Sequence, residues 1–166
     1  TMLANGLVFM VVVVVLSGAG SLFGWRAITN CNYLAFIVPH ILFALNVILI
    51  AFVLSFLFQK VTTAQKWGQS LMMWTLVLVW MVFGIVMGND PPAWAWHVSN
   101  VLPVVAFYNA VNILFDQSAV ATVPASVLWT GGEDGLLEPC LCMAVTAGIG
   151  IALVSWFDAM EARGVK

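Results

Sequence analysis

Charged side chains are scarce in this 166-residue chain, which has only five Lys and Arg and seven Asp and Glu, or 7% of its residues. Water-soluble domains carry about 25% charged residues. Hydrophobic residues make up 63% of the chain, and a soluble domain of this length cannot bury so much apolar surface. No charge interrupts residues 27–59 or 67–89. Runs of this kind are typical of helices that cross a lipid bilayer.

Residues that carry chemistry are also few. Three cysteines are too few for a disulfide scaffold, and Cys140 and Cys142 are spaced C-x-C instead of the C-x-x-C of redox and zinc sites. The chain has no phosphate-binding loop of the type G-x-x-x-x-G-K-[ST], no H-E-x-x-H and no G-x-S-x-G. No basic patch suggests nucleic acid. We therefore predict no catalytic residues, no metal site and no nucleic-acid partner on this chain.

The apolar runs predict an all-α, polytopic membrane protein with one integral domain over residues 1–166. Four predicted spanning helices cover residues 3–23, 33–58, 67–88 and 139–157. The segment 98–115 is apolar over only about 18 residues, and Pro103 and three asparagines interrupt it. Lipid-exposed breaks of this kind are not tolerated in the hydrocarbon. We predict a broken, re-entrant or interfacial helical pair there, beside an aromatic belt at Trp94 and Trp96.

The few charges are sorted by position, which predicts the orientation. Lys60 and Lys66 lie between two apolar runs, and Arg163 and Lys166 lie at the C-terminus. Basic loops stay on the cytoplasmic side, or on the matrix or stromal side in an organelle. We therefore expect the turn after the second span and both termini on that side. The acidic loop 116–138 is expected on the opposite side, provided that 98–115 does not cross.

Polar side chains inside the apolar runs are the candidate site residues. Asn46 is the deepest of them, and we favour a hydrogen bond to a neighbouring helix over contact with a substrate. His40 and His97 fall near the same predicted face, which is the minimum for a haem. Because His97 lies in a loop rich in Pro and Trp, we favour interfacial hydrogen bonding for both. No cofactor is predicted on this chain.

From residue 33 onward, the order of elements resembles the transmembrane domain of A-subfamily ABC transporters, which have the type-2 exporter fold. The stretch LSFLFQKVTTAQ (54–65) looks like the family's helix end and Thr-Ala turn. The stretch VLPVVAFYNAVNILFD (101–116) looks like its re-entrant outer helix pair, with Val104 where the family has a second proline. The stretch LCMAVTAGIGIALVSWFDAMEARGVK (141–166) is similar to its last helix.

The resemblance implies a fragment or a split half of a membrane domain that moves lipids or other amphipathic molecules. ATP would be hydrolysed by a nucleotide-binding domain or partner outside this chain. It also implies that one group of polar side chains faces a hydrated outer cleft: Asn100, Tyr108, Asn109 and Asn112. Cys31 would share that side with Cys140 and Cys142, within reach of a disulfide. The alternative is a small helical subunit of a respiratory or other energy-transducing complex, in which 98–115 crosses fully.

Overall fold

The structure, a computed structural model, describes residues 26–57 and 93–163 without a break, and only short pieces elsewhere between residues 11 and 77. The predicted spans over 3–23 and 67–88 therefore lie almost wholly outside the described residues. What is described is helical, and it contains no strand beyond one bridge between Cys31 and Val123. Two of its helices are long and apolar enough to cross a membrane. The described part of the chain is therefore helical, and two of its helices have the length and apolar composition of membrane-spanning helices.

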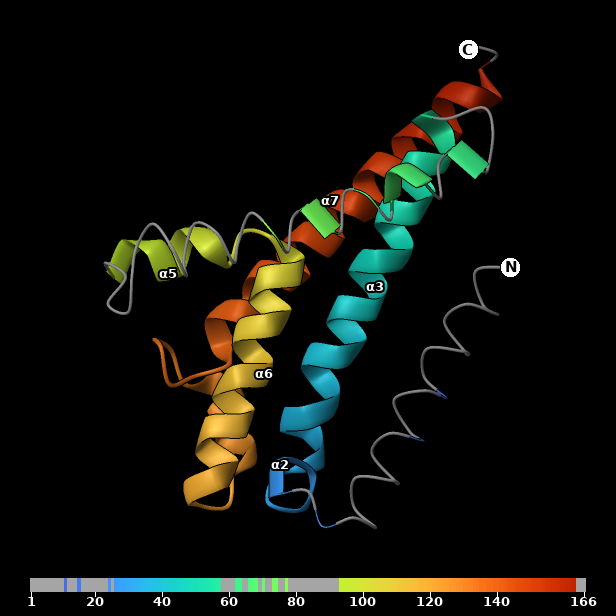
Figure 1. The fold of residues 1–166 in the computed structure, drawn as a ribbon. Coiled ribbons are helices and arrows are strands. Elements are labelled where there is room, and N and C mark those ends of the chain that lie inside the picture. Colours follow the sequence, from blue (N-terminus) through green and yellow to red (C-terminus); the bar gives the residue numbers. More distant parts are fainter. Residues whose placement is uncertain are drawn as a thin grey trace.

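These two long helices are α3 (Tyr33–Leu57) and α7 (Leu137–Ala162). They run side by side and in the same direction (Figure 1). Asn46 of α3 contacts Met143 of α7, and ten residues further along α3 the ring of Phe56 stacks on that of Phe157 at 5.4 Å. The second contact lies nearer the C-terminal end of each helix than the first, so the two helices are parallel. The beginnings of α3 and α7 therefore lie toward the same end of the molecule.

The broken pair was predicted within 98–115, whereas the structure has α5 (Ala93–Ser99) and α6 (Pro103–Val120), which extend beyond both ends of that range. The break falls at residues 100–102, and Pro103 begins α6 instead of dividing a helix. Proline suits this first position because its missing N–H needs no partner there. α6 also continues to Val120, so the loop before α7 is shorter than expected. Figure 1 shows α5 lying across the direction of α6.

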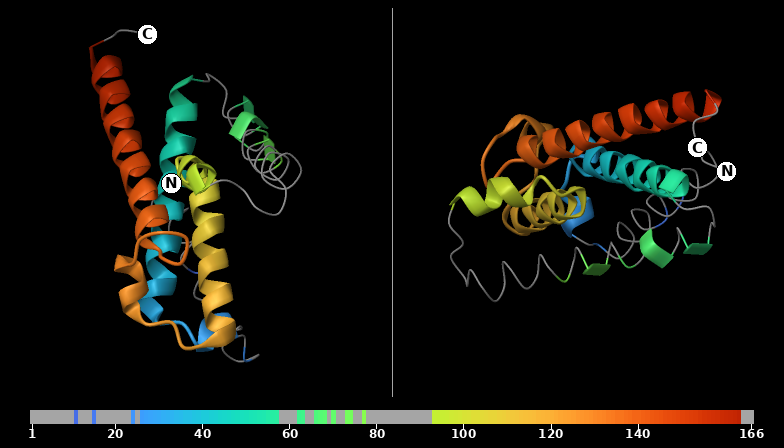
Figure 2. Two further views of the ribbon diagram at one scale, coloured as in Figure 1. Left: turned by 90° about the vertical axis from the view of Figure 1, so that its left-hand side faces the viewer. Right: turned by 90° about the horizontal axis from the view of Figure 1, so that it is seen from above.

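α6 runs antiparallel to α3 and covers only the first half of it. Near the start of α6, Phe107 stacks on Phe43 with ring centroids 4.3 Å apart. Near its end, the Ser118 carbonyl accepts a hydrogen bond from Asn30 Nδ2 at 3.0 Å. In the views of Figure 2, α3 and α7 extend together beyond the part that α6 covers. α6 therefore begins beside the middle of α3 and runs back toward the beginning of that helix.

The buried core lies at the end where α3 begins. There α2 (Arg26–Thr29), the start of α3, α6 and the 3-10 helix η2 (Ala125–Trp129) meet the loop before α7. Two backbone hydrogen bonds, Asn32 N to Val123 O at 3.0 Å and Val123 N to Asn30 O at 2.8 Å, tie the chain before α3 to the chain after α6. The core residues are Cys31, Ala35, Ala110, Ile113, Leu114, Val123, Val127 and Leu136. This end is packed like a small globular cap.

The three cysteines are free thiols. The disulfide that the resemblance brings within reach is therefore not formed. Cys31 is buried in the core, where its thiol donates a weak hydrogen bond to the Leu114 carbonyl at 3.8 Å. Burial raises the pKa of the Cys31 thiol above its ordinary value. Cys31 therefore behaves as a small packing side chain.

Candidate functional site

Asn46 joins the two long helices through hydrogen bonds in an otherwise apolar contact. Its amide Nδ2 donates to the Leu42 carbonyl on its own helix and to the Met143 carbonyl on α7, each at 2.8 Å. Its Oδ1 accepts from the Thr146 hydroxyl at 2.9 Å. The side chain is buried, and an amide in apolar surroundings costs free energy unless it is paired in this way. The geometry is that of a helix-to-helix contact.

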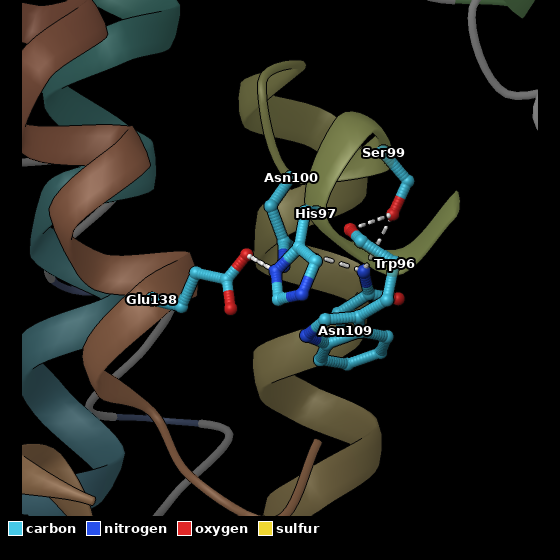
Figure 3. A network of polar contacts seen from close by, with 6 residues as sticks. All are labelled: Trp96, His97, Ser99, Asn100, Asn109 and Glu138. Carbon is cyan, nitrogen blue, oxygen red and sulfur yellow. Dashed lines mark hydrogen bonds and ion pairs between the residues drawn. The ribbon is translucent and has the colours of Figure 1, made fainter. Parts of the chain in front are cut away.

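A second group of polar side chains lies where α5 turns into α6. We call Trp96, Ser99, Asn100 and Asn109 the junction cluster (Figure 3). Asn109 Nδ2 donates to Asn100 Oδ1 at 2.9 Å and to Ser99 Oγ at 3.3 Å. The Ser99 hydroxyl donates to the Trp96 carbonyl at 2.7 Å. These bonds hold the turn between the two helices against the first turns of α6.

Two N–H groups of the junction cluster are left over. Asn100 is fully buried, and its Nδ2 has no hydrogen-bond partner among the described residues. The same holds for Trp96 Nε1, which is also buried. Exchanging the amide O and N of Asn100 does not solve this, because Asn109 Nδ2 already donates to Asn100 Oδ1. Buried donors without acceptors are costly, so these two stand out.

An ion pair links the junction to the start of α7. His97 Nδ1 lies 2.6 Å from Glu138 Oε1. The His97 side chain is 61% exposed and that of Glu138 is 22% exposed. Solvent weakens such a pair, so it contributes little to stability. The contact marks where the junction cluster lies along α7, next to Glu138.

This position coincides with one end of the apolar part of α7. No charged residue lies between Glu138 and Asp158 on this helix. They are 20 positions apart, which corresponds to about 30 Å along a helix axis. The hydrocarbon core of a bilayer is also about 30 Å thick. The junction cluster therefore lies level with one boundary of a slab that fits a bilayer.

The five candidate polar residues from the sequence thus separate into three groups. Asn100 and Asn109 meet in the junction cluster. Asn46 lies between α3 and α7. Tyr108 and Asn112 lie on α6 with exposed side chains and belong to neither group. No shared cleft brings all five together among the described residues.

His40 and His97 do not face each other across a common site. His40 lies between aromatic rings, 4.4 Å from Phe36 and 5.0 Å from Phe107 by centroid, and its Nδ1 bonds the Phe36 carbonyl. His97 is engaged by Glu138 instead. The described residues contain no group of three or more His, Cys, Asp or Glu that is placed to hold a metal.

Sequence reasoning missed the roles of Trp96, Ser99 and Thr146. Trp96 and Asn100 are four positions apart, which puts them on one helical face, and this was the available signal. The sequence placed Trp96 together with Trp94 in an aromatic belt at the membrane interface. In the structure Trp94 is 58% exposed, whereas Trp96 packs against the core.

No family model, characterised protein or solved structure matches this chain.

Proposed function

We propose that this chain is the membrane-spanning part of an ATP-driven transporter that moves lipids or other amphipathic molecules. ATP is hydrolysed on a domain or partner outside this chain. The observation that carries the proposal is the α5–α6 pair: α6 packs against the first part of the two parallel apolar helices, and α5 turns away from it at a polar junction. α6 runs from the junction toward the packed end where α3 begins, so the pair lies where an element that covers the outer end of a transport pathway is expected.

In this proposal the protein has four crossings, by the segments 3–23, 33–58, 67–88 and 139–157. The packed cap formed by α2, η2 and the loop before α7 stands on the side opposite Lys60, Lys66 and the C-terminus. Two observations support this orientation. α3 and α7 are parallel, so both carry the chain away from the cap. The basic residues follow the far ends of both helices, as the positive-inside tendency expects.

The orientation is tested by labelling single cysteines in a variant whose three native cysteines are replaced by Ala. One variant carries Gly131→Cys in the exposed loop before α7, and a matched one carries Arg163→Cys just after α7. The vesicles are sealed and right-side-out. A membrane-impermeant maleimide is expected to label the Gly131→Cys variant from outside and the Arg163→Cys variant only after permeabilisation. Labelling of both from the same side contradicts a crossing by α7.

Transport is tested on the protein purified in mild detergent together with its bound subunits. We expect an ATP-binding subunit or domain to co-purify, and reconstituted vesicles to move a fluorescent phospholipid between leaflets only when ATP is supplied. The variant Asn46→Ala, which loosens the α3–α7 contact, should slow this movement. The control Asn112→Ala, on an exposed position of α6, should not. The proposal is rejected if the complete, correctly oriented complex moves the phospholipid at the same rate with and without ATP.

One observation favours the second candidate, a subunit of an energy-transducing complex. Small side chains recur along one exposed face of α7, at Ala144, Gly148, Ala152 and Ser155. Such faces allow close approach of a further membrane helix, as in a multi-subunit assembly. Co-purification with redox subunits, without any ATP-binding partner, would favour this candidate over the transporter.

A further inference from the structure

We propose that Trp96 Nε1 and Asn100 Nδ2 bind the ester carbonyl of a glycerolipid, at the level where α7 begins. The two nitrogens are buried N–H donors without an acceptor among the described residues. The inference rests on the membrane placement proposed above, but it does not require that the protein transports anything.

The two donors belong to one face of one turn. Asn100 follows Trp96 by four positions, and its backbone N–H bonds the Trp96 carbonyl at 3.2 Å, so the helical turn of α5 continues to Asn100. Side chains at this spacing are neighbours, with Cβ atoms about 5–6 Å apart. Figure 3 shows both residues in the turn next to Asn109. In the proposed complex one acceptor oxygen lies between the two nitrogens.

The chemistry of the donors favours a neutral carbonyl over a phosphate. A carbonyl oxygen has two lone pairs and accepts two N–H bonds. Phosphates are instead bound by Arg or Lys, or by many charge-assisted donors. Neither Arg nor Lys takes part in the junction cluster, and the nearby His97 is already engaged by Glu138. Two uncharged donors therefore match an ester.

The surroundings suit the rest of a lipid. Four apolar side chains of α5 and the following turn are exposed: Trp94, Val98, Val101 and Leu102. Trp94 and Val98 are each two positions from Trp96, so they lie on the face of the short helix opposite the donors. In the proposed complex an acyl chain lies on this exposed face, and its ester end reaches around the turn to the two nitrogens. Glu138, at 2.6 Å from His97, marks the end of the charge-free part of α7. In a bilayer the ester groups of glycerolipids lie at this boundary between hydrocarbon and headgroups.

Both nitrogens are covered in this structure, so an entering carbonyl has to displace a neighbour. The exposed His97 is three positions before Asn100 and therefore adjacent to it on the turn. We assign this step to rotation of the His97 side chain, which breaks its contact with Glu138. This motion involves a solvated side chain and leaves the Asn109–Asn100 bond intact.

The test compares two phosphatidylcholines that differ only in having ester or ether linkages to the same chains. The full chain, labelled with ¹⁵N in its tryptophan side chains, is kept in a maltoside micelle, which has no ester carbonyl. Each lipid is titrated in while the indole N–H resonances are recorded. The Trp96 resonance is identified by its loss in Trp96→Phe, which keeps the ring bulk. Trp94→Phe, on the same short helix, is the matched control.

We expect the ester lipid to shift the Trp96 N–H resonance and the ether lipid to leave it in place. Trp96→Phe should weaken binding of the ester lipid by about two- to tenfold, the effect of one hydrogen bond, and reduce its preference over the ether lipid. Trp94→Phe should change neither quantity. The wild-type titration needs no variant, so a folding defect in Trp96→Phe does not obscure the outcome.

Equal shifts with ester and ether lipids would overturn the proposal in favour of phosphate contact or general partition. An unmoved Trp96 resonance would overturn it in favour of a trapped water on the two donors. Neither result bears on transport, since the titration contains no ATP. Conversely, failure of ATP-dependent lipid movement leaves the ester preference standing, so the two proposals fail separately.

Discussion

The hydrogen bonds of Asn46 provide the sharpest measure of how α3 and α7 are held together. The double-mutant cycle of Asn46→Ala and Thr146→Val removes the bond between Asn46 Oδ1 and the Thr146 hydroxyl, which is 2.9 Å long. Valine keeps the shape of threonine, and the Met143 carbonyl remains for the Asn46 amide in the Thr146 variant. Hydrogen bonds between membrane helices contribute about 0.6 kcal/mol on average, with a maximum of about 1.7.

We therefore expect a coupling energy of about 0.6 kcal/mol between the two sites. The total cost of Asn46→Ala should be larger, because the bond to Met143 and side-chain packing are lost as well. Thr146→Val alone should lower the free energy of unfolding only slightly. The Thr146 hydroxyl also lies 2.9 and 3.0 Å from the Cys142 and Met143 carbonyls of its own helix, so it does not depend on Asn46 for a partner.

The assay is reversible unfolding in mixed micelles of a mild detergent and dodecyl sulfate, followed by tryptophan fluorescence. The wild type, both single variants and the double variant are measured under identical conditions, with Asn112→Ala as a control at an exposed position. A coupling energy indistinguishable from zero would refute the inferred contact. A cost for Asn112→Ala as large as that of Asn46→Ala would show that the assay does not report on burial.

Three further predictions concern close packing and one thiol. A Cβ at Gly150 would approach an α3 side chain to 3.0 Å, so Gly150→Val should destabilise the protein by roughly 1–3 kcal/mol, whereas Gly148→Val, in open space, should change the unfolding midpoint little. Gly135→Ala would place a Cβ against a backbone carbonyl of its own loop and should cost roughly 1–3 kcal/mol in the same assay, while Gly131→Ala should be neutral. Burial raises the pKa of the Cys31 thiol, so the folded protein binds the thiol proton more tightly than the unfolded protein does. The corresponding contribution to the free energy of unfolding is fully present below the pKa of the unfolded state and is lost as the pH rises through the pKa of the folded state. Alkylation of Cys31 by iodoacetamide, followed by mass spectrometry, should therefore be slower in the folded than in the unfolded protein and should accelerate only at higher pH; equal rates in both states would contradict this.

The sequence predicted the long helices well, because continuous apolar runs have few alternatives. Residues 33–58 correspond to α3, which ends at Leu57. The prediction 139–157 was too short for α7, which begins at Leu137 and continues past Asp158 to Ala162. Pro139 was compatible with an earlier start, because proline is tolerated in the first turn. The acidic residues near the C-terminal end mark where apolar surroundings stop, and a helix does not have to stop with them.

The tertiary pairing was not available from local patterns. Asn46 finds Met143 at a separation of 97 residues, and Cys31 finds Leu114 at 83. Whether Asn100 and Asn109 meet depends on where the chain turns between α5 and α6. The break was expected at Pro103 itself, whereas it lies at residues 100–102, and this placement brings Asn100 under Asn109. The exposed positions of Tyr108 and Asn112 follow from the same helix register.

The parallel pairing of α3 and α7 also sets the order in which the chain can assemble. The partners of Asn46 on α7 are synthesised about 100 residues after it, or several seconds later at 5–20 residues per second. Until α7 is made, the Asn46 amide of α3 lies in apolar surroundings without its partners on α7. The bond from Asn46 Nδ2 to the Leu42 carbonyl is local to α3 and already available during that interval. The newly made helix thus supplies one of the three hydrogen bonds of Asn46 by itself, and α7 supplies the other two when it is made.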